Sequence, residues 1–158
     1  LAIGLLYQIF SEVTMNFNLD RWVGHITENA IKQISEAFGK RLKDTGVTRI
    51  QWIAMFYINK HEMISPRELS KIMNVQDSSA TRLIERMEKE DLIEKIPSEK
   101  DKRVTFVKLT SKGNSLFKTL IPYGDEFNNE LIEGIDEEEL EVFERVLHKM
   151  IENISKKG

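Results

Sequence analysis

Apolar residues recur at spacings of three and four along most of this chain, a period that predicts amphipathic helices. The first long stripe includes Trp22, Ile26 and Ala30, and Gly46 is placed to end that helix. Beyond it the same period continues in segments separated by Gly, Pro or short polar turns. The predicted helices cover about residues 20–44, 49–60, 66–73, 77–90, 111–133 and 137–154.

Three of these helices begin at a predicted capping box, in which Ser, Thr or Asp is followed three residues later by Glu or Gln. The boxes pair Thr48 with Gln51, Ser65 with Glu68, and Asp136 with Glu139. Pro66 strengthens the second box, because the first position of a helix needs no backbone N–H. Pro122 lies inside the fifth predicted helix, which it is expected to kink or divide.

Two short segments in the middle of the chain alternate in polarity, which predicts strands over 93–97 and 104–109. The segment between them has several charges and no Gly, so we expect a loop longer than a two-residue hairpin turn. The predicted fold class is mainly α with a small antiparallel β-ribbon. Residues 20–158 contain no linker or repeat, which predicts a single domain after an N-terminal extension over 1–19.

Composition and charge narrow the class of protein. The 158 residues include no Cys, which excludes a disulfide framework and thiolate chemistry and favours a cytoplasmic protein. The first apolar run has no basic leader and is too short to span a bilayer, so we expect neither a signal peptide nor a membrane partner. The net charge is −3, yet residues 60–112 carry 12 Lys and Arg against 10 Asp and Glu, whereas residues 113–158 carry 5 against 11. The middle of the chain is therefore mildly basic, and the acid is concentrated towards the C-terminal end.

A short helix, a tight turn, a second helix and a ribbon follow one another within residues 48–110, in the order of a winged helix-turn-helix. In such a unit the second helix enters the major groove of DNA, so it needs one apolar face and one polar face. The expected apolar stripe consists of Ala80, Leu83, Ile84 and Met87. The residues expected to contact DNA are Ser78, Ser79, Thr81, Arg82 and Arg86. Among these, Arg82 is suited to a forked contact with guanine.

The charged loop of the ribbon is the expected tip of the wing. Its charged residues are Lys100, Asp101, Lys102 and Arg103. Arg103 suits the narrow minor groove, where the negative potential is enhanced, and Asp101 would orient its guanidinium by a hydrogen bond. Ser65 and Arg67, at the start of the short helix, are candidates for contacts with the DNA backbone.

The chain resembles the MarR family of bacterial transcriptional regulators in two stretches, SPRELSKIMNVQDSSATRLIERMEKEDLIEK and SEKDKRVTFVKLTSKG. The second stretch is similar to that family's wing in Asp101-x-Arg103, Leu109-Thr110 and Gly113, and GVTRIQWIAMFYI resembles its second helix. The resemblance covers about residues 20–155. It implies a homodimer built from helices over about 20–45 and 111–155, which binds a palindromic operator in double-stranded DNA. It also implies a repressor that is released by a small-molecule effector.

Two positions depart from the family pattern, and other functions remain as alternatives. Gln76 stands where a better capping residue is common, and Pro122 interrupts a helix that is usually continuous. No nucleophile elbow, phosphate-binding loop or dinucleotide fingerprint is present, so an enzyme is not expected. The three His residues are far apart in sequence, so no metal or other cofactor is expected, and a metal-sensing regulator of the same fold is only an alternative. A second alternative is a winged-helix module that binds a protein instead of DNA.

Several aromatic and sulfur-containing side chains would suit either a ligand cavity or an ordinary core. They are Trp52, Phe56, Met63, Phe117 and Tyr123. Because core packing explains each of them equally well, the sequence nominates no ligand site.

Overall fold

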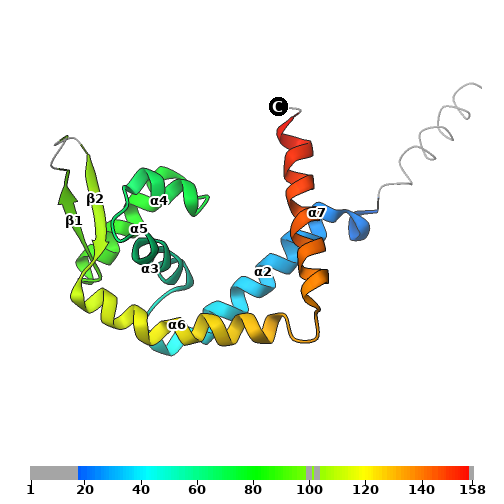
Figure 1. Cartoon of the computed structure of the whole chain (residues 1–158), viewed down its shortest axis with the longest axis horizontal. Helices are drawn as coiled ribbons and strands as arrows, with labels where there is room; N and C mark the ends of the chain where they lie inside the picture. Colours follow the sequence, from blue (N-terminus) through cyan, green and yellow to red (C-terminus); the bar gives the residue numbers. More distant parts are fainter. Residues whose placement is uncertain (1–17, 99–100, 102–103, 157–158) are drawn as a thin grey trace, which may run out of the picture. The chain divides into compact units, whose positions relative to one another are not determined.

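A computed structural model describes residues 18–98, 101 and 104–156 of the chain. Short 3-10 turns, η1 (Leu19–Arg21) and η2 (Lys43–Thr45), flank the first helix. The other elements are α2 (Val23–Arg41), α3 (Arg49–His61), α4 (Pro66–Ile72), α5 (Asp77–Lys89), β1 (Ile93–Pro97), β2 (Thr105–Leu109), α6 (Ser111–Leu131) and α7 (Glu137–Ser155) (Figure 1). The predicted fold class is confirmed, with six helices and one antiparallel pair of strands in the described part. The predicted N-terminal extension falls on residues 1–17 and the start of η1, and residues 1–17 lie outside the described chain.

The helices begin where local sequence chemistry places them. All three predicted capping boxes are formed, and each N3 side chain accepts a hydrogen bond from the N-cap backbone. In the first box, Gln51 Oε1 accepts from Thr48 N at 2.9 Å. Thr110 caps α6, because its hydroxyl accepts from Gly113 N at 3.0 Å. Each cap pairs a backbone donor at the helix start, which has no partner within the helix.

The described chain divides into two compact units, one ending at Phe117 and the other beginning at Lys118. In the first unit α3, α4, α5 and the two strands enclose one apolar core. Its most deeply buried side chains include Leu42, Met55, Ile58, Ile64, Leu69, Ile84, Met87, Ile93 and Val107. Each such side chain stabilises the fold by about 1.5–3 kcal/mol relative to its exposed state. This core fixes the positions of the short helix, the second helix and the ribbon.

The ribbon is attached to the helical core at its base. β1 and β2 pair antiparallel from Ile93 opposite Leu109 to Pro97 opposite Thr105. Ile64, in the loop before α4, exchanges two backbone hydrogen bonds with Val107 of β2, at 2.8 and 3.1 Å. The ribbon therefore extends from a fixed base beside α4 and α5 (Figure 1).

In the second unit α7 leaves its apolar stripe exposed. The helix has no buried residue, although apolar residues recur along one face at helical spacing. The large exposed apolar side chains of α7 are Val142, Phe143, Val146, Met150, Ile151 and Ile154. α6 continues through Pro122 without interruption, so the proline does not divide it. Among the described residues, no helix combines the length and the apolar character that crossing a bilayer would require.

Gly113 sits where the start of α6 meets the start of the ribbon. A Cβ atom on this residue would lie 2.0 Å from the carbonyl oxygen of Leu92, which is far inside van der Waals contact. The same carbonyl accepts a hydrogen bond from Thr110 N at 3.1 Å, so it has little freedom to move. Glycine at 113 is therefore required by packing between two backbones.

We predict that Gly113→Ala lowers the free energy of unfolding by about 1–3 kcal/mol, because the added methyl group must displace α6 from Leu92. The matched control is Gly39→Ala in α2, where nothing lies within 4 Å of the added Cβ. That change should instead stabilise the helix by about 0.5–1 kcal/mol. Urea unfolding of both variants measures the difference, and equal stabilities would contradict the close approach at Gly113.

Candidate nucleic-acid interface

The turn between α4 and α5 is closed by backbone hydrogen bonds at the end of α4. Asn74 adopts a positive φ of 51°, a conformation that Asn tolerates better than most residues. Asn74 N donates to Lys71 O at 3.1 Å and Val75 N donates to Ser70 O at 3.0 Å. This arrangement stops α4 and turns the chain sharply into α5.

A partly buried polar contact connects the start of α5 to α4. The hydroxyl of Ser70, which is 1% exposed, forms a hydrogen bond with the carboxylate of Asp77. Gln76 is the N-cap residue of α5 but makes no capping hydrogen bond with its side chain. Gln76, the residue that departs from the family pattern, therefore leaves the helix start without a side-chain cap. The next residue, Asp77, instead connects the start of α5 to α4 through Ser70.

The second helix has the two faces that the sequence predicts. Its buried residues are Ala80, Leu83, Ile84 and Met87, as expected. Its predicted DNA-contacting residues, Ser78, Ser79, Thr81, Arg82 and Arg86, are all exposed. Thr81 bonds back to Asp77 O at 2.9 Å. Within the described chain no residue forms a hydrogen bond or ion pair with the side chain of Ser78, Ser79 or Arg82, so these three groups are available to an external partner.

Arg86 differs from Arg82, because its guanidinium has partners within the protein. Its Nη2 donates to Thr48 Oγ1 at 3.3 Å, and its Nε lies 4.0 Å from Glu90 Oε1. A helical wheel places Arg86 at the flank of the polar face and cannot show either contact.

At the start of α4, the hydrogen-bonding groups of Ser65 are used within its capping box. Its hydroxyl donates to Glu68 Oε2 at 2.6 Å and accepts from Glu68 N at 3.2 Å. The hydrogen bond from the Ser65 hydroxyl, followed by that from its backbone N–H, holds the pKa of Glu68 below its ordinary value. The N–H and the hydroxyl of Ser65 are thus both hydrogen-bonded to the Glu68 carboxylate within the protein. Arg67 is exposed on the same turn.

Of the four charged residues predicted at the tip of the DNA-binding wing, only Asp101 belongs to the described chain. Asp101 is exposed, its N–H donates to Ser98 Oγ at 3.3 Å, and its carbonyl accepts from Val104 N at 2.9 Å. These bonds connect Asp101 to both ends of the loop, and Ser98 N donates to Val104 O at 2.9 Å, which joins the two ends directly. Lys100, Lys102 and Arg103 lie outside the described residues, and their contacts with DNA remain predictions.

Sequence reasoning missed the residues that hold the far end of α5. Lys112 Nζ donates to Glu90 O at 2.6 Å, and Thr110 Oγ1 donates to Asp91 O at 2.7 Å. Gln51 Nε2 donates to Glu90 Oε2 at 2.6 Å. Gln51 was visible as a capping residue, but no local signal connects it with Glu90, which is 39 positions away.

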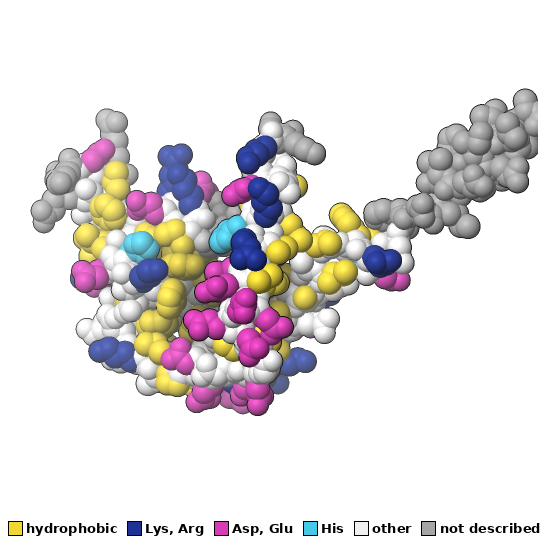
Figure 2. All heavy atoms as spheres, turned by 45° about the vertical axis from the view of Figure 1, so that its right-hand side comes forward, with side chains coloured by type: hydrophobic (Ala, Val, Ile, Leu, Met, Phe, Trp, Pro, Cys, Tyr) yellow, Lys and Arg dark blue, Asp and Glu magenta, His cyan; other side chains and the backbone are white. Residues whose placement is uncertain are grey.

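The surface charge has a distinct pattern in each unit. Acidic side chains gather on part of the face shown in Figure 2. In the second unit, the first turn of α7 contains Glu137, Glu138 and Glu139. In the first unit two acidic residues are paired with lysines of the ribbon, Glu88 with Lys95 at 2.6 Å and Glu94 with Lys108 at 3.2 Å.

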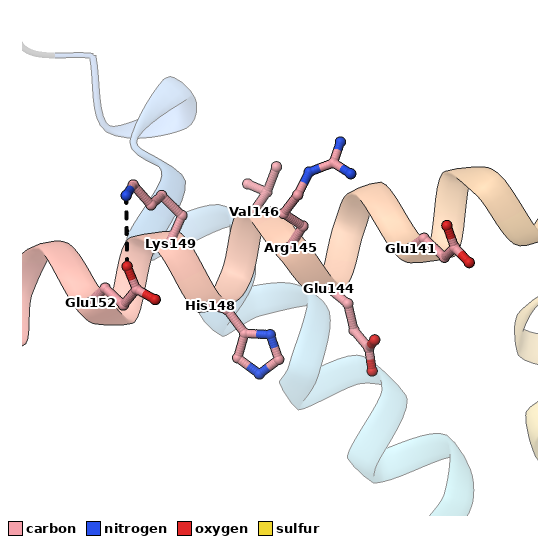
Figure 3. Close-up of a pocket in the computed structure, with 7 residues that line it drawn as sticks. All are labelled: Glu141, Glu144, Arg145, Val146, His148, Lys149 and Glu152. Carbon is pink, nitrogen blue, oxygen red and sulfur yellow. Dashed lines mark ion pairs between the residues drawn. The ribbon is translucent and has the colours of Figure 1, made fainter.

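The metal-sensing alternative would require metal-ligating side chains that lie close together. On α7, Glu144 and His148 point to the same side of the helix, away from Val146, in a depression lined by charged residues (Figure 3). The lining also contains Lys149, which pairs with Glu152 at 3.6 Å. Within the described ranges, no group of three or more His, Asp and Glu residues could hold a metal ion.

The aromatic residues at the centre of the first unit pack against one another. The ring of Trp52 lies 5.2 Å from that of Phe38 and 6.1 Å from those of Phe56 and Phe117, between centroids. Phe117 is buried, whereas Phe56 is 42% exposed. Phe117 is thus a core residue, Trp52 is half-buried, and the cluster reaches the surface at Phe56.

Taken together, a closed helix-turn-helix, an exposed polar face on its second helix and an anchored wing define a winged helix-turn-helix DNA-binding protein. The family model described as MarR family matches residues 45–104. The transcription regulator MarR from Oenococcus oeni PSU-1 is 31% identical, with 82% of this chain and 98% of that chain covered and a TM-score of 0.70. The chain belongs to the MarR family of transcriptional regulators.

Two further solved structures share the fold. A mutant MarR from Escherichia coli in complex with operator DNA is 24% identical, with 85% of this chain and 97% of that chain covered and a TM-score of 0.77. BpsR from Bordetella bronchiseptica, whose DNA binding is regulated by 6-hydroxynicotinic acid, is 20% identical, with 85% and 96% covered and a TM-score of 0.78.

Proposed function

We propose that this chain binds a palindromic operator in double-stranded DNA as a homodimer and represses transcription until a small-molecule effector releases it. The observation that carries the proposal is the exposed face of α5. Ser78, Ser79 and Arg82 have no partner among the described residues, while the opposite face of the same helix is buried. Hydroxyl and guanidinium groups on such a face suit hydrogen bonds with base edges in the major groove.

The distribution of charge along the chain supports DNA contact through the winged helix-turn-helix. Residues 60–112 carry the basic excess, and Lys95 and Lys108 pair with Glu88 and Glu94 beside α5. The acidic excess lies in residues 113–158, which include α7. Because the net charge of the chain is −3, binding depends on local contacts, and salt should weaken it strongly. Repression follows if the operator overlaps a promoter, because a bound dimer excludes the polymerase.

The exposed apolar stripe of α7 supports a homodimer. Phe143 is 58% exposed, Ile151 59% and Ile154 71%, whereas soluble monomers rarely expose large apolar patches. A second copy of the same chain presents the same stripe, and two-fold pairing buries both. A two-fold dimer also matches a palindromic operator, because its two α5 helices meet half-sites about one helical turn (~34 Å) apart.

An effector is supported by the aromatic cluster and by one relative. Phe56 stacks on Trp52 at a surface-exposed position, which would suit a planar aromatic molecule. BpsR, which shares the fold, responds to 6-hydroxynicotinic acid, a compound of this kind. We propose that an aromatic effector shifts the dimer towards a conformation that binds DNA more weakly.

The DNA-binding assignment is tested with a duplex enriched from a random-sequence pool by the native protein. Arg82→Ala should weaken binding to that duplex by about tenfold or more, and Arg82→Lys should not restore it, because lysine lacks the guanidinium fork. Fluorescence anisotropy measures both affinities. Arg145→Ala, which removes an exposed arginine of α7, is the control and should bind as the native protein does. If no sequence is enriched, the protein-interaction module becomes the better hypothesis.

The dimer is tested by placing a charge in the apolar stripe of α7. Phe143→Glu should raise the dimer dissociation constant by about 100-fold, because an interface cannot bury an unpaired carboxylate cheaply. Sedimentation equilibrium measures the mass. His148→Glu is the matched control, since His148 points away from Val146 and the stripe (Figure 3). Equal dissociation constants for the two variants would place the dimer contact elsewhere.

A further inference from the structure

Four side chains form a closed ring between the start of α3 and the end of α5. Thr48 Oγ1 donates to Gln51 Oε1 at 2.8 Å, and Gln51 Nε2 donates to Glu90 Oε2 at 2.6 Å. Glu90 Oε1 lies 4.0 Å from Arg86 Nε, and Arg86 Nη2 donates to Thr48 Oγ1 at 3.3 Å. The ring joins the start of α3 to the end of α5. Thr48 and Arg86 are 38 positions apart in sequence, and Gln51 and Glu90 are 39 positions apart.

Gln51 is the buried member of the ring and has its polar groups paired there. It is 2% exposed, and its amide oxygen accepts from both the N–H and the hydroxyl of Thr48. Its amide nitrogen donates to the carboxylate of Glu90. A buried amide that loses its partner destabilises the surrounding structure, so the bond to Glu90 holds the two helices in one register.

Glu90 is an unexpected residue for the end of a helix. A carboxylate at a helix C-terminus faces the negative end of the helix dipole, which is locally unfavourable. Lys112 Nζ, at 2.6 Å from Glu90 O, offsets part of that cost. The local cost is consistent with a tertiary role for the Glu90 side chain, and its two carboxylate oxygens face Gln51 and Arg86.

We propose that Gln51 and Glu90 are positioning residues that set the orientation of α5 for base readout, and that Arg86 serves this ring instead of a base edge. The inference rests on the proposed function, since it requires α5 to read DNA. α5 has 13 residues and is therefore about 20 Å long. Its first turn is held by the contact between Ser70 and Asp77, and its last turn by the ring.

A tilt at the ring would move Ser78 and Arg82 relative to the base edges while leaving them exposed. Contacts with base edges need a fixed geometry, whereas contacts with phosphates tolerate small shifts. Loss of the ring should therefore lower sequence discrimination more than general affinity for DNA.

The test measures the ratio of affinities for two duplexes of equal length, one enriched from a random-sequence pool by the native protein and one scrambled. Gln51→Glu sets two carboxylates against each other and should lower this ratio by about tenfold. Glu90→Ala removes the acceptor from the exposed side of the ring and should cause a similar loss, even if Gln51→Glu does not fold. The double variant Gln51→Glu/Glu90→Gln exchanges acceptor and donor, so the hydrogen bond re-forms and the ratio should return to within about twofold of the native value.

Rescue by the double variant separates positioning from simple destabilisation, because lower stability alone would reduce both affinities in parallel and leave the ratio unchanged. Arg86→Ala should lower the ratio and add no further loss to Gln51→Glu, since both break the same ring. An unchanged ratio in Gln51→Glu and Glu90→Ala, or no rescue in the double variant, would overturn the inference. If Arg86→Ala lowered the affinity ratio further in the Gln51→Glu background, the role given to Arg86 would be wrong, and Arg86 would instead contact DNA. Failure to enrich any duplex would instead overturn the proposed function, and the inference with it.

Discussion

Burial of one stripe of α5 is the constraint on which the rest of the structure depends. Leu83, Ile84 and Met87 lie in the core with α3, α4 and β1, so the helix cannot rotate without exposing them to water. A 13-residue helix with one face fixed in this way must present its other face to solvent. Apolar packing therefore decides where Ser78 and Arg82 point, although neither takes part in it.

Polar contacts then remove the freedom that apolar packing leaves. A hydrophobic face resists rotation of a helix but is less sensitive to sliding or tilting, because apolar contacts are not directional. Hydrogen bonds are directional, and they occur at both ends of α5, from Ser70 to Asp77 and from Gln51 to Glu90. The start of α6 adds a third constraint through Lys112 and the close approach of Gly113 to Leu92. α5, the base of the β1–β2 ribbon and the first turn of α6 are thus held together by specific contacts.

The sequence was sufficient wherever structure is decided within a few residues. Capping boxes such as Thr48 with Gln51 are formed as predicted, since both partners lie within one helical turn, and the apolar period of α5 identified its buried stripe. The bond from Gln51 to Glu90 was out of reach, because it joins residues brought together only by the tertiary fold. For the same reason a helical wheel, which places Arg82 opposite the apolar stripe and Arg86 toward the flank, could not show that Arg86 contacts Thr48. The requirement for glycine at 113 likewise arises from a distant backbone.

The central claim, that the exposed face of α5 lies in the major groove, can be tested with a single thiol. The chain has no Cys, so Ser78→Cys introduces one reactive group on that face. The duplex enriched by the native protein would carry a thiol tether at C5 of successive thymines, a position that opens into the major groove. We expect disulfide cross-linking at one or two neighbouring thymines in each half-site, and none from Glu141→Cys on α7. Absence of cross-linking from Ser78→Cys at every thymine, in a complex that still forms, would contradict the account.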